Sequence, residues 1–248
     1  MAAVDKFLFD RAAQIATQAN LPWAELDGKT VLVTGSTGLI GSQIVRTLLS
    51  RNDCVDAGIS VVLPVRNIKK AQALFGDRND VSVLEWSLGD ELAGSERVDY
   101  VVHAACGTSS KSFLETPATT IMQIVHGGEA VLRYAYSVDA KKVLFLSTME
   151  VYGEVEGVAT EDNLGKLDPM VVRNSYPEAK RLVECLCASY ATEHGVPSVV
   201  MRLAQTFGEG VHPDDMRVFA DFGRHAIDGK DIVLLSDGLK RNGYLSVD

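Results

Sequence analysis

The fold of this chain is decided by one stretch, Thr30-Val31-Leu32-Val33-Thr34-Gly35-Ser36-Thr37-Gly38-Leu39-Ile40-Gly41. Its first five residues form a β-branched apolar run, which is typical of a buried strand. From Ile40 to Leu49 the apolar positions recur at helical spacing. A glycine-rich turn between a strand and a helix is the arrangement that binds dinucleotide phosphates. The stretch therefore predicts a strand, a phosphate loop and a helix.

Each glycine of this loop has a separate role. Gly35 allows a sharp turn out of the strand, Gly38 allows close approach of a pyrophosphate, and Gly41 allows the helix to pack on the strand. The free N–H groups and the dipole of the helix N-terminus favour an anion there. Taken alone, the motif is also compatible with a tight strand-to-helix turn. The residues expected to bind the cofactor here are Gly35, Ser36, Thr37, Gly38, Leu39, Ile40 and Gly41.

Length and composition indicate an ordinary globular protein. With 248 residues, 46% of them hydrophobic and 23% charged, the chain can form one large α/β domain, alone or with a small cap. Its net charge of -9 comes without a cluster of Lys and Arg, which disfavours nucleic-acid binding because that binding depends on neutralising phosphates.

The sequence also limits the cellular context and the metal chemistry. Its longest apolar runs are only strand-length, and charged residues interrupt the apolar pattern of residues 1–20, so we expect no membrane span, no signal peptide and a cytoplasmic protein. We expect the four cysteines to be reduced and mostly buried, and neither they nor the histidines have metal-ligand spacing. The cysteines are Cys54, Cys106, Cys185 and Cys187.

Strand and helix patterns alternate along the chain. This alternation predicts a doubly wound parallel sheet with helices on both faces, and ligands that bind beyond the carboxyl ends of the strands. A helix over 5–19 is expected to lie on the body of the domain. The other expected elements are strands at 59–65, 81–86, 98–103 and 142–147, and helices at 117–138 and from 176 onward.

Two strand ends bear on the cofactor. The second strand ends at Pro64-Val65-Arg66 without the acidic residue that binds the ribose hydroxyl of NAD, and Arg66 would suit the 2′-phosphate of NADP. The alternative is an arginine on a solvated turn. The fourth strand ends at His103-Ala104-Ala105, where we expect the small Ala104 and Ala105 to lie against the cofactor and His103 to have no chemical role.

Candidate catalytic residues follow the fifth strand and open a later helix. Thr148 and Glu150 place a hydroxyl and a carboxylate on the loop that leaves a central strand, where they could act as hydrogen-bond donor and general acid/base. Tyr176 and Lys180 are four residues apart on one helix face, so the ammonium is expected to lower the pKa of the phenol. The alternative for this pair is an ordinary amphipathic helix.

In this order and spacing, the motifs resemble the extended short-chain dehydrogenase/reductase family. The stretches 34–41, 103–105, 147–153 and 174–181 carry the resemblance, which covers nearly all of the chain after residue 28 and is closest to nucleotide-sugar dehydratases and UDP-glucuronate decarboxylases.

The resemblance implies a Rossmann fold with a small, apparently truncated C-terminal substrate-binding cap. The corresponding division is an N-terminal helical extension at 1–28, an NAD(P)-binding Rossmann domain at 29–202 and a partial substrate-binding region at 203–248. Helices at 117–137 and 176–194 correspond to those that pair in the family's homodimers.

The resemblance also implies an activity. Such enzymes oxidise carbon 4 of a UDP- or dTDP-linked sugar with bound NAD, act on the ketone and return the hydride. Tyr176 would be the base, Lys180 its electrostatic partner and ribose anchor, and Thr148 the hydroxyl contact to the sugar. Glu150 would be the acid/base carboxylate. The substrate-binding residues implied are Gln205 and Arg241.

Two other functions remain open from the sequence. Arg66 favours an NADP-dependent carbonyl reductase that acts on a small ketone. The departures from the family pattern, such as Met149 in place of the dehydratases' aspartic acid, would suit a non-catalytic dinucleotide-binding sensor. The sequence does not separate decarboxylation, epimerisation and dehydration.

Overall fold

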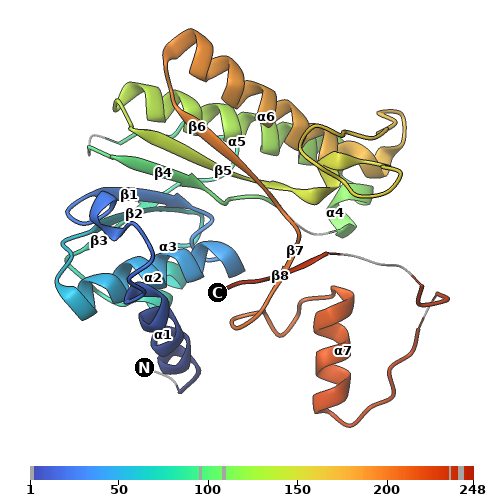
Figure 1. Cartoon of the computed structure of the whole chain (residues 1–248), viewed down its shortest axis with the longest axis horizontal. Helices are drawn as coiled ribbons and strands as arrows, with labels where there is room; N and C mark the ends of the chain where they lie inside the picture. Colours follow the sequence, from blue (N-terminus) through green and yellow to red (C-terminus); the bar gives the residue numbers. More distant parts are fainter. Residues whose placement is uncertain (1–2, 95–96, 108–109, 235, 240–242) are drawn as a thin grey trace.

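A six-stranded parallel sheet forms the centre of the molecule (Figure 1). The computed structural model describes residues 3–94, 97–107, 110–234, 236–239 and 243–248. The strand order is β3-β2-β1-β4-β5-β6, so the chain winds outward from β1 in both directions and the expected doubly wound Rossmann sheet is confirmed. The strands are β1 (Thr30–Thr34), β2 (Ser60–Val65), β3 (Val81–Glu85), β4 (Tyr100–His103), β5 (Lys142–Thr148) and β6 (Ser198–Leu203).

Helices cover both faces of this sheet, with α2 and α3 on one face and α5 and α6 on the other (Figure 1). The helices of this part of the chain are α1 (Ala3–Ala16), α2 (Leu39–Val55), α3 (Ile68–Phe75), α4 (Ser110–Glu115), α5 (Pro117–Ser137) and α6 (Ser175–His194). Within the described residues, short 3-10 helices occur at η1 (Trp23–Glu25), η2 (Met149–Tyr152) and η3 (Val172–Asn174).

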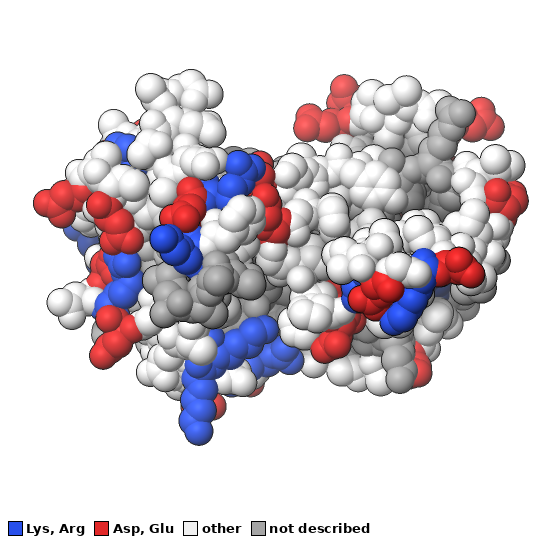
Figure 2. All heavy atoms as spheres, turned by 90° about the horizontal axis from the view of Figure 1, so that it is seen from below, with Lys and Arg blue, Asp and Glu red and all other residues white. Residues whose placement is uncertain are grey.

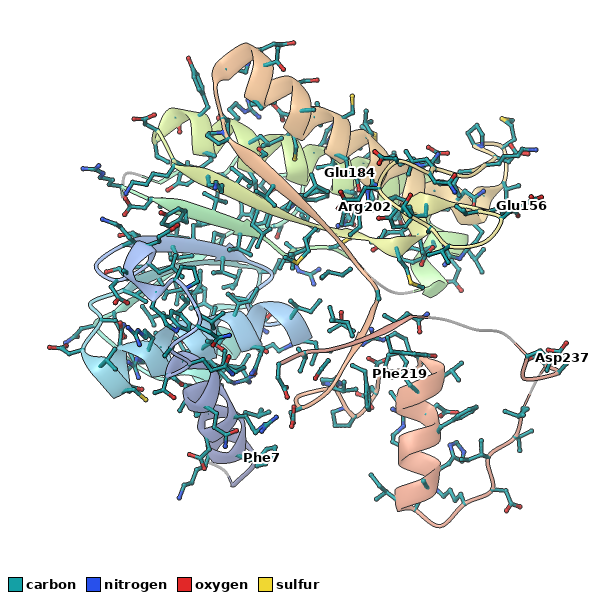
Figure 3. All side chains as sticks on the ribbon, in the orientation of Figure 1. Phe7, Glu156, Glu184, Arg202, Phe219 and Asp237 are labelled. Atoms are coloured by element: carbon teal, nitrogen blue, oxygen red, sulfur yellow. The ribbon has the colours of Figure 1, made fainter. Side chains whose placement is uncertain are left out.

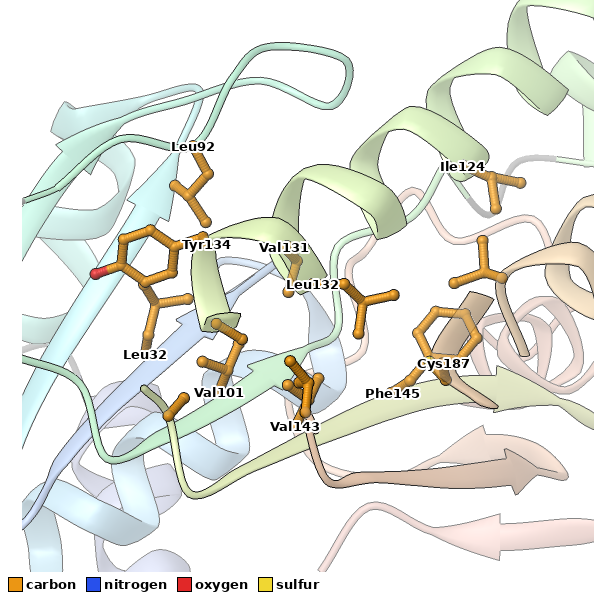
Figure 4. Packing of buried hydrophobic residues seen from close by; sticks show 14 of the residues in the cluster. Leu32, Leu92, Val101, Ile124, Val131, Leu132, Tyr134, Val143, Phe145 and Cys187 are labelled. Carbon is orange, nitrogen blue, oxygen red and sulfur yellow. The ribbon is translucent and has the colours of Figure 1, made fainter. Parts of the chain in front are cut away.

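The alternation of side chains along each strand divides the apolar interior into two cores. In β1, Leu32 joins the core beneath α5 and α6, whereas Val31 and Val33 join the core beneath α2 and α3. Phe145 of β5, which is almost fully buried, lies in the first of these cores (Figure 4). Because both faces are covered, the strands are apolar on both sides, as parallel strands usually are.

Two adjacent glycines let α5 pack closely on its neighbours, Gly128 against α6 and Gly127 against Leu88. A Cβ on Gly128 would lie 2.6 Å from Cγ1 of Val183 on α6. A Cβ on Gly127 would overlap the side chain of Leu88. This pairing fixes α6 over β5 and so places the first turn of α6 at the carboxyl edge of the sheet.

The N-terminal helix lies on α2, as expected, and buries Leu8, Ala12 and Ala16. It ends at Ala16, three residues before the predicted end, because residues 17–20 turn toward η1. The side chain of Arg11 donates a hydrogen bond of 2.6 Å to Asp248, which connects this helix to the other end of the chain.

The C-terminal part forms a small separate sheet beside a helix. Strand β7 (Gln205–Phe207) pairs in parallel with β8 (Tyr244–Ser246), and α7 (Val218–Ile227) lies next to them (Figure 1). The ring of Phe219 on α7 meets Phe207 and Tyr244 edge-on, with centroids 4.9 and 5.9 Å apart. Many apolar side chains in this part stay exposed, including Met216 and Ile227.

The cysteines differ from the expectation that most are buried. Cys187 is buried and Cys106 half-buried, but Cys54 and Cys185 are exposed. Cys54 lies in the last turn of α2, and Cys185 lies on the outer side of α6. All four are free thiols.

Figure 2 shows charged side chains of both signs on one face of the molecule. On the face seen in Figure 2, Lys and Arg lie in small groups close to Asp and Glu. Within the described residues, no helix is long and apolar enough to cross a membrane.

Candidate active site

The loop between β1 and α2 has the geometry that its glycines predict. Gly35 has φ of 69°, and a Cβ there would lie 2.6 Å from the backbone of Ala104. A Cβ on Gly41 would overlap the carbonyl oxygen of Gly35. Both glycines are therefore required by close backbone approach, whereas a Cβ on Gly38 would meet only that same oxygen, at 3.3 Å.

The N-terminus of α2 is suited to bind an anion. Gly38 is the N-cap residue, and no side chain caps the helix. The hydroxyl of Ser36 is buried and has no hydrogen-bond partner among the described residues. An orphaned buried donor beside an uncapped helix N-terminus fits a dinucleotide phosphate, so these residues could hold the expected cofactor. The individual contacts of residues 35–41 with it remain predictions.

His103 has a structural place at the end of β4. Its Nδ1 lies 2.8 Å from Oγ1 of Thr34, and that oxygen also accepts a hydrogen bond of 3.2 Å from the amide of Ala105. Burial, with a smaller contribution from the charge of Lys180, lowers the pKa of His103 to about 3. The neutral ring thus joins β1 to β4 beside the glycine loop, and Ala104 and Ala105 lie against Gly35.

Arg66 follows β2 directly and is exposed to solvent. The next residue, Asn67, caps α3 and accepts a hydrogen bond of 2.9 Å from the amide of Lys70. An exposed arginine at a strand end is compatible both with binding a 2′-phosphate and with a solvated turn. Its role in cofactor binding stays a prediction.

Tyr176 and Lys180 are both buried on the inner face of α6. The ammonium of Lys180 donates a hydrogen bond of 2.8 Å to the carbonyl of Leu146 in β5 and lies 4.6 Å from the ring centroid of Phe145. The ring of Tyr176 stacks on Phe113 of α4, with centroids 4.5 Å apart. The pair therefore belongs to the site edge of the sheet and does not lie on a solvated helix face.

The expected lowering of the Tyr176 pKa by Lys180 is wrong for this structure. The pKa of Tyr176 is raised, mainly by burial and next by the electrostatic influence of the nearby Cys106, while a hydrogen bond with Thr148 lowers it. Smaller effects come from Glu150, which raises this pKa, and Arg173, which lowers it. Tyr176 is consequently a neutral phenol at neutral pH.

Thr148 and Glu150 lie where β5 ends, as expected. Oγ1 of Thr148 accepts a hydrogen bond of 3.3 Å from the amide of Glu150 and so caps η2. The carboxylate of Glu150 pairs with Arg173 of η3, with Nη1 to Oε2 at 3.0 Å and Nη2 to Oε1 at 3.2 Å. The guanidinium of Arg173 lies 5.2 Å from the ring centroid of Phe113. Arg173 and Phe113 were not predicted as site residues.

A second charged network lies next to the carboxyl edge of the sheet. The hydroxyl of Ser147 donates a hydrogen bond of 2.5 Å to Glu184 of α6, and Arg202 of β6 donates one of 2.7 Å to the same carboxylate. The two charged side chains lie close together where α6 crosses β6 (Figure 3). The guanidinium of Arg202 also lies 5.0 Å from the ring centroid of Tyr152. This network connects α6, β5, β6 and η2 and was not predicted.

Of the two predicted substrate-binding residues, the structure describes Gln205, which is not among the residues of this cluster. Gln205 lies in β7 of the small sheet, where its amide donates a hydrogen bond of 3.3 Å to Gly243. Arg241 lies outside the described residues. Both roles remain predictions. No group of three or more His, Cys, Asp or Glu side chains within the described ranges could hold a metal ion.

The arrangement can perform acid/base chemistry at the end of a dinucleotide site. A phenol, a hydroxyl and a carboxylate converge from α6, β5 and η2 at the carboxyl edge of the sheet, the edge that also holds the glycine loop. Ligands of open parallel sheets bind at this edge.

Comparison with known proteins supports this description. The model of the NAD dependent epimerase/dehydratase family matches residues 31–248. UDP-glucuronic acid decarboxylase 6 of Arabidopsis thaliana is 30% identical over 220 residues, which are 88% of this chain and 62% of that protein. This chain thus spans 62% of that relative's length.

Solved structures share the fold. A UDP-glucose 4-epimerase from Thermotoga maritima has a TM-score of 0.73 at 24% identity and covers 88% of this chain and 69% of its own. A UDP-glucuronic acid 4-epimerase from Bacillus cereus, solved with UDP-glucuronic acid and NAD, has a TM-score of 0.72 at 21% identity with the same coverage, 88% and 69%. With its residues 31–248 matched by the family model and its fold shared with such enzymes, the chain belongs to the NAD dependent epimerase/dehydratase family.

Proposed function

We propose that this chain forms the NAD-binding and catalytic part of an enzyme that modifies a nucleotide sugar by transient oxidation at sugar carbon 4. The observation that carries the proposal is the convergence of Tyr176 and Thr148, with Lys180 one turn further along α6, at the sheet edge that holds the glycine loop. The family of the chain and its UDP-glucuronic acid decarboxylase relative support a UDP-linked sugar as substrate.

In the proposed reaction, each residue has a defined task. NAD, held at the uncapped N-terminus of α2, would supply the hydride acceptor. Tyr176 first releases its own proton to solvent, and the hydrogen bond with Thr148 that lowers the pKa of Tyr176 stabilises the phenolate so formed. This phenolate takes the proton of the sugar 4-hydroxyl and becomes a phenol again, while the hydride would pass to NAD. Lys180 is held by the Leu146 carbonyl and contributes a fixed positive charge on the same helix face.

Decarboxylation is the outcome that we favour after this oxidation. Loss of water would require an acid to protonate the leaving group, and Met149 occupies the position after Thr148 where dehydratases carry an aspartic acid. Loss of carbon dioxide from a uronic acid requires only the neighbouring ketone as electron acceptor. Glu150 is then available as the acid/base that handles the proton returned to the sugar.

The product masses test this function. The protein is incubated with NAD and a panel of UDP- and dTDP-sugars that includes UDP-glucuronate, and loss of the mass of carbon dioxide is the expected result. A Tyr176→Phe variant should reduce kcat by about 10³-fold, since it removes the general base. Unimpaired turnover in that variant would contradict the assignment of Tyr176, and unchanged masses with an NMR-detected epimer would replace decarboxylation by epimerisation.

We infer that the cofactor is NAD rather than NADP. The family to which the chain belongs is NAD dependent, and Arg66 is exposed beyond the end of β2. Calorimetric titration of the protein and of an Arg66→Ala variant with both dinucleotides tests this. We expect tighter binding of NAD by the unaltered protein and little change in NAD affinity in the variant. Tighter binding of NADP that is lost with Arg66 would reverse the assignment.

We also propose that the chain forms a homodimer through α5 and α6. The outer faces of these helices expose Met122, Tyr136 and Leu182 by 50%, 55% and 47%, respectively. Apolar side chains on two adjacent helices favour burial against a second copy of the same surface.

A further inference from the structure

The ion pair between Glu150 and Arg173 joins a proposed catalytic residue to one without an assigned role. The two side chains make two contacts, at 3.0 and 3.2 Å, yet they remain 35% and 39% exposed, respectively. Glu150 is the one carboxylate paired with Arg173 among the described residues. An exposed ion pair contributes little stability, because water solvates both charges when they separate. Arg173 can therefore exchange Glu150 for another carboxylate at little cost in free energy.

The position of the guanidinium does not depend on Glu150 alone. Arg173 also lies over the ring of Phe113, at 5.2 Å from its centroid, and Phe113 in turn stacks on Tyr176 at 4.5 Å. The stack holds the positive charge beside the phenol even when its carboxylate partner changes. A planar guanidinium held in this way presents the fork of donors that matches a carboxylate.

We propose that Arg173 is a specificity-determining residue that binds the carboxylate of a uronic acid sugar in exchange for Glu150. The inference rests on the proposed function, since the sugar must lie beside Tyr176. A sugar carboxylate that displaces Glu150 keeps Arg173 paired and at the same time releases Glu150 as a free acid/base. A neutral sugar offers no such replacement, so Glu150 stays bound to the arginine.

Binding measurements test this exchange directly. All variants are made in a Tyr176→Phe background, which suppresses turnover, and are titrated with UDP-glucuronate and UDP-glucose in the presence of NAD. Arg173→Gln should weaken UDP-glucuronate binding by about 10-fold and change UDP-glucose binding by less than about 2-fold, because a charged hydrogen-bonded pair is lost only with the uronic acid. Arg173→Lys should restore part of this affinity, since it keeps the charge without the fork.

A double variant distinguishes exchange from simple repulsion. Glu150→Gln should strengthen UDP-glucuronate binding several-fold, because the competing carboxylate is gone. If Glu150 competes for Arg173, this gain disappears in an Arg173→Gln background; if Glu150 only repels the sugar carboxylate, the gain persists and the exchange is overturned. The matched control is Arg133→Gln, which breaks an exposed pair with Glu129 on α5 and should leave both affinities unchanged.

The remaining outcomes are also decisive. If both UDP-sugars bind and Arg173→Gln affects them equally or not at all, the inference fails while the proposed function stands. If neither sugar nor UDP itself binds, the proposed function fails and the inference with it. Circular dichroism melting of each variant shows whether a lost affinity reflects unfolding.

Discussion

His103 gives the molecule a pH-dependent element of stability. Burial of the ring lowers the pKa of His103 from the ordinary value of 6.5 to about 3 in the folded chain. Between these values the unfolded chain binds a proton that the folded chain does not, so stability is lost as the pH falls from 6.5 toward 3. From pH 7 to pH 5 the loss from this group should be about 2 kcal/mol, as measured by urea unfolding at each pH.

A His103→Asn variant should lack this pH-dependent loss, since an amide can still hydrogen-bond Thr34 without titrating. His126→Asn is the matched control, because that side chain is exposed on α5, and the variant should keep the slope of the unaltered chain. An unchanged slope in His103→Asn would show that the ring is protonated in the folded state.

At the residue scale, the sequence pattern predicts the types of the candidate catalytic residues, but not the electrostatic environment that sets their pKa values. Tyr176, Lys180, Thr148 and Glu150 were predicted from a strand end and from the spacing of four residues along a helix. The predicted direction of the Tyr176 pKa shift was wrong, because this pKa depends first on burial and next on the electrostatic influence of Cys106, and both raise it. Such contacts join residues far apart in the sequence.

At the scale of the elements, we expect cofactor binding to depend on the turn between β1 and α2. Gly41→Ala should destabilise the protein by about 3 kcal/mol, because the new methyl group would overlap the Gly35 carbonyl and displace α2 from β1. Gly38→Ala is the matched control, since its methyl group would meet that oxygen at 3.3 Å. We expect Gly38→Ala to fold normally but to bind NAD more weakly. Urea unfolding and calorimetric titration separate the two effects, and equal stabilities would refute the packing argument.

A second element-scale prediction concerns the joint of α6 with β5 and β6. Glu184 and Arg202 are only 12% and 20% exposed, so Glu184→Gln leaves a largely buried guanidinium without its charged partner. The free energy of unfolding should fall by about 3 kcal/mol. Glu129→Gln, which breaks an exposed pair on α5, should change it by less than about 0.5 kcal/mol. If Glu184→Gln lowered the free energy of unfolding as little as Glu129→Gln does, Glu184 would have to be solvated in the folded protein.

At the scale of the whole molecule, the outer faces of α5 and α6 lie opposite the side of the sheet that carries α2 and α3 (Figure 1). If these faces form the proposed dimer interface, Leu182→Glu should convert the protein to a monomer in sedimentation velocity, because it places a charge in an apolar contact. Val55→Glu is the control, since Val55 is equally apolar and exposed by 46% but ends α2 on the other side. A dimer that survives Leu182→Glu would place the interface elsewhere.

The parallel sheet, its strand and helix pattern, and the glycine loop were determined by the sequence itself. Apolar periodicity and the conformational freedom of glycine act within a few neighbouring residues, so they can be read locally. The pairing of Glu150 with Arg173, the network of Glu184 with Arg202, the exposure of Cys54 and Cys185, and the raised pKa of Tyr176 were decided only by the tertiary structure. Charge pairing and burial depend on which distant segments meet in space, and that is set by how the helices pack on the completed sheet.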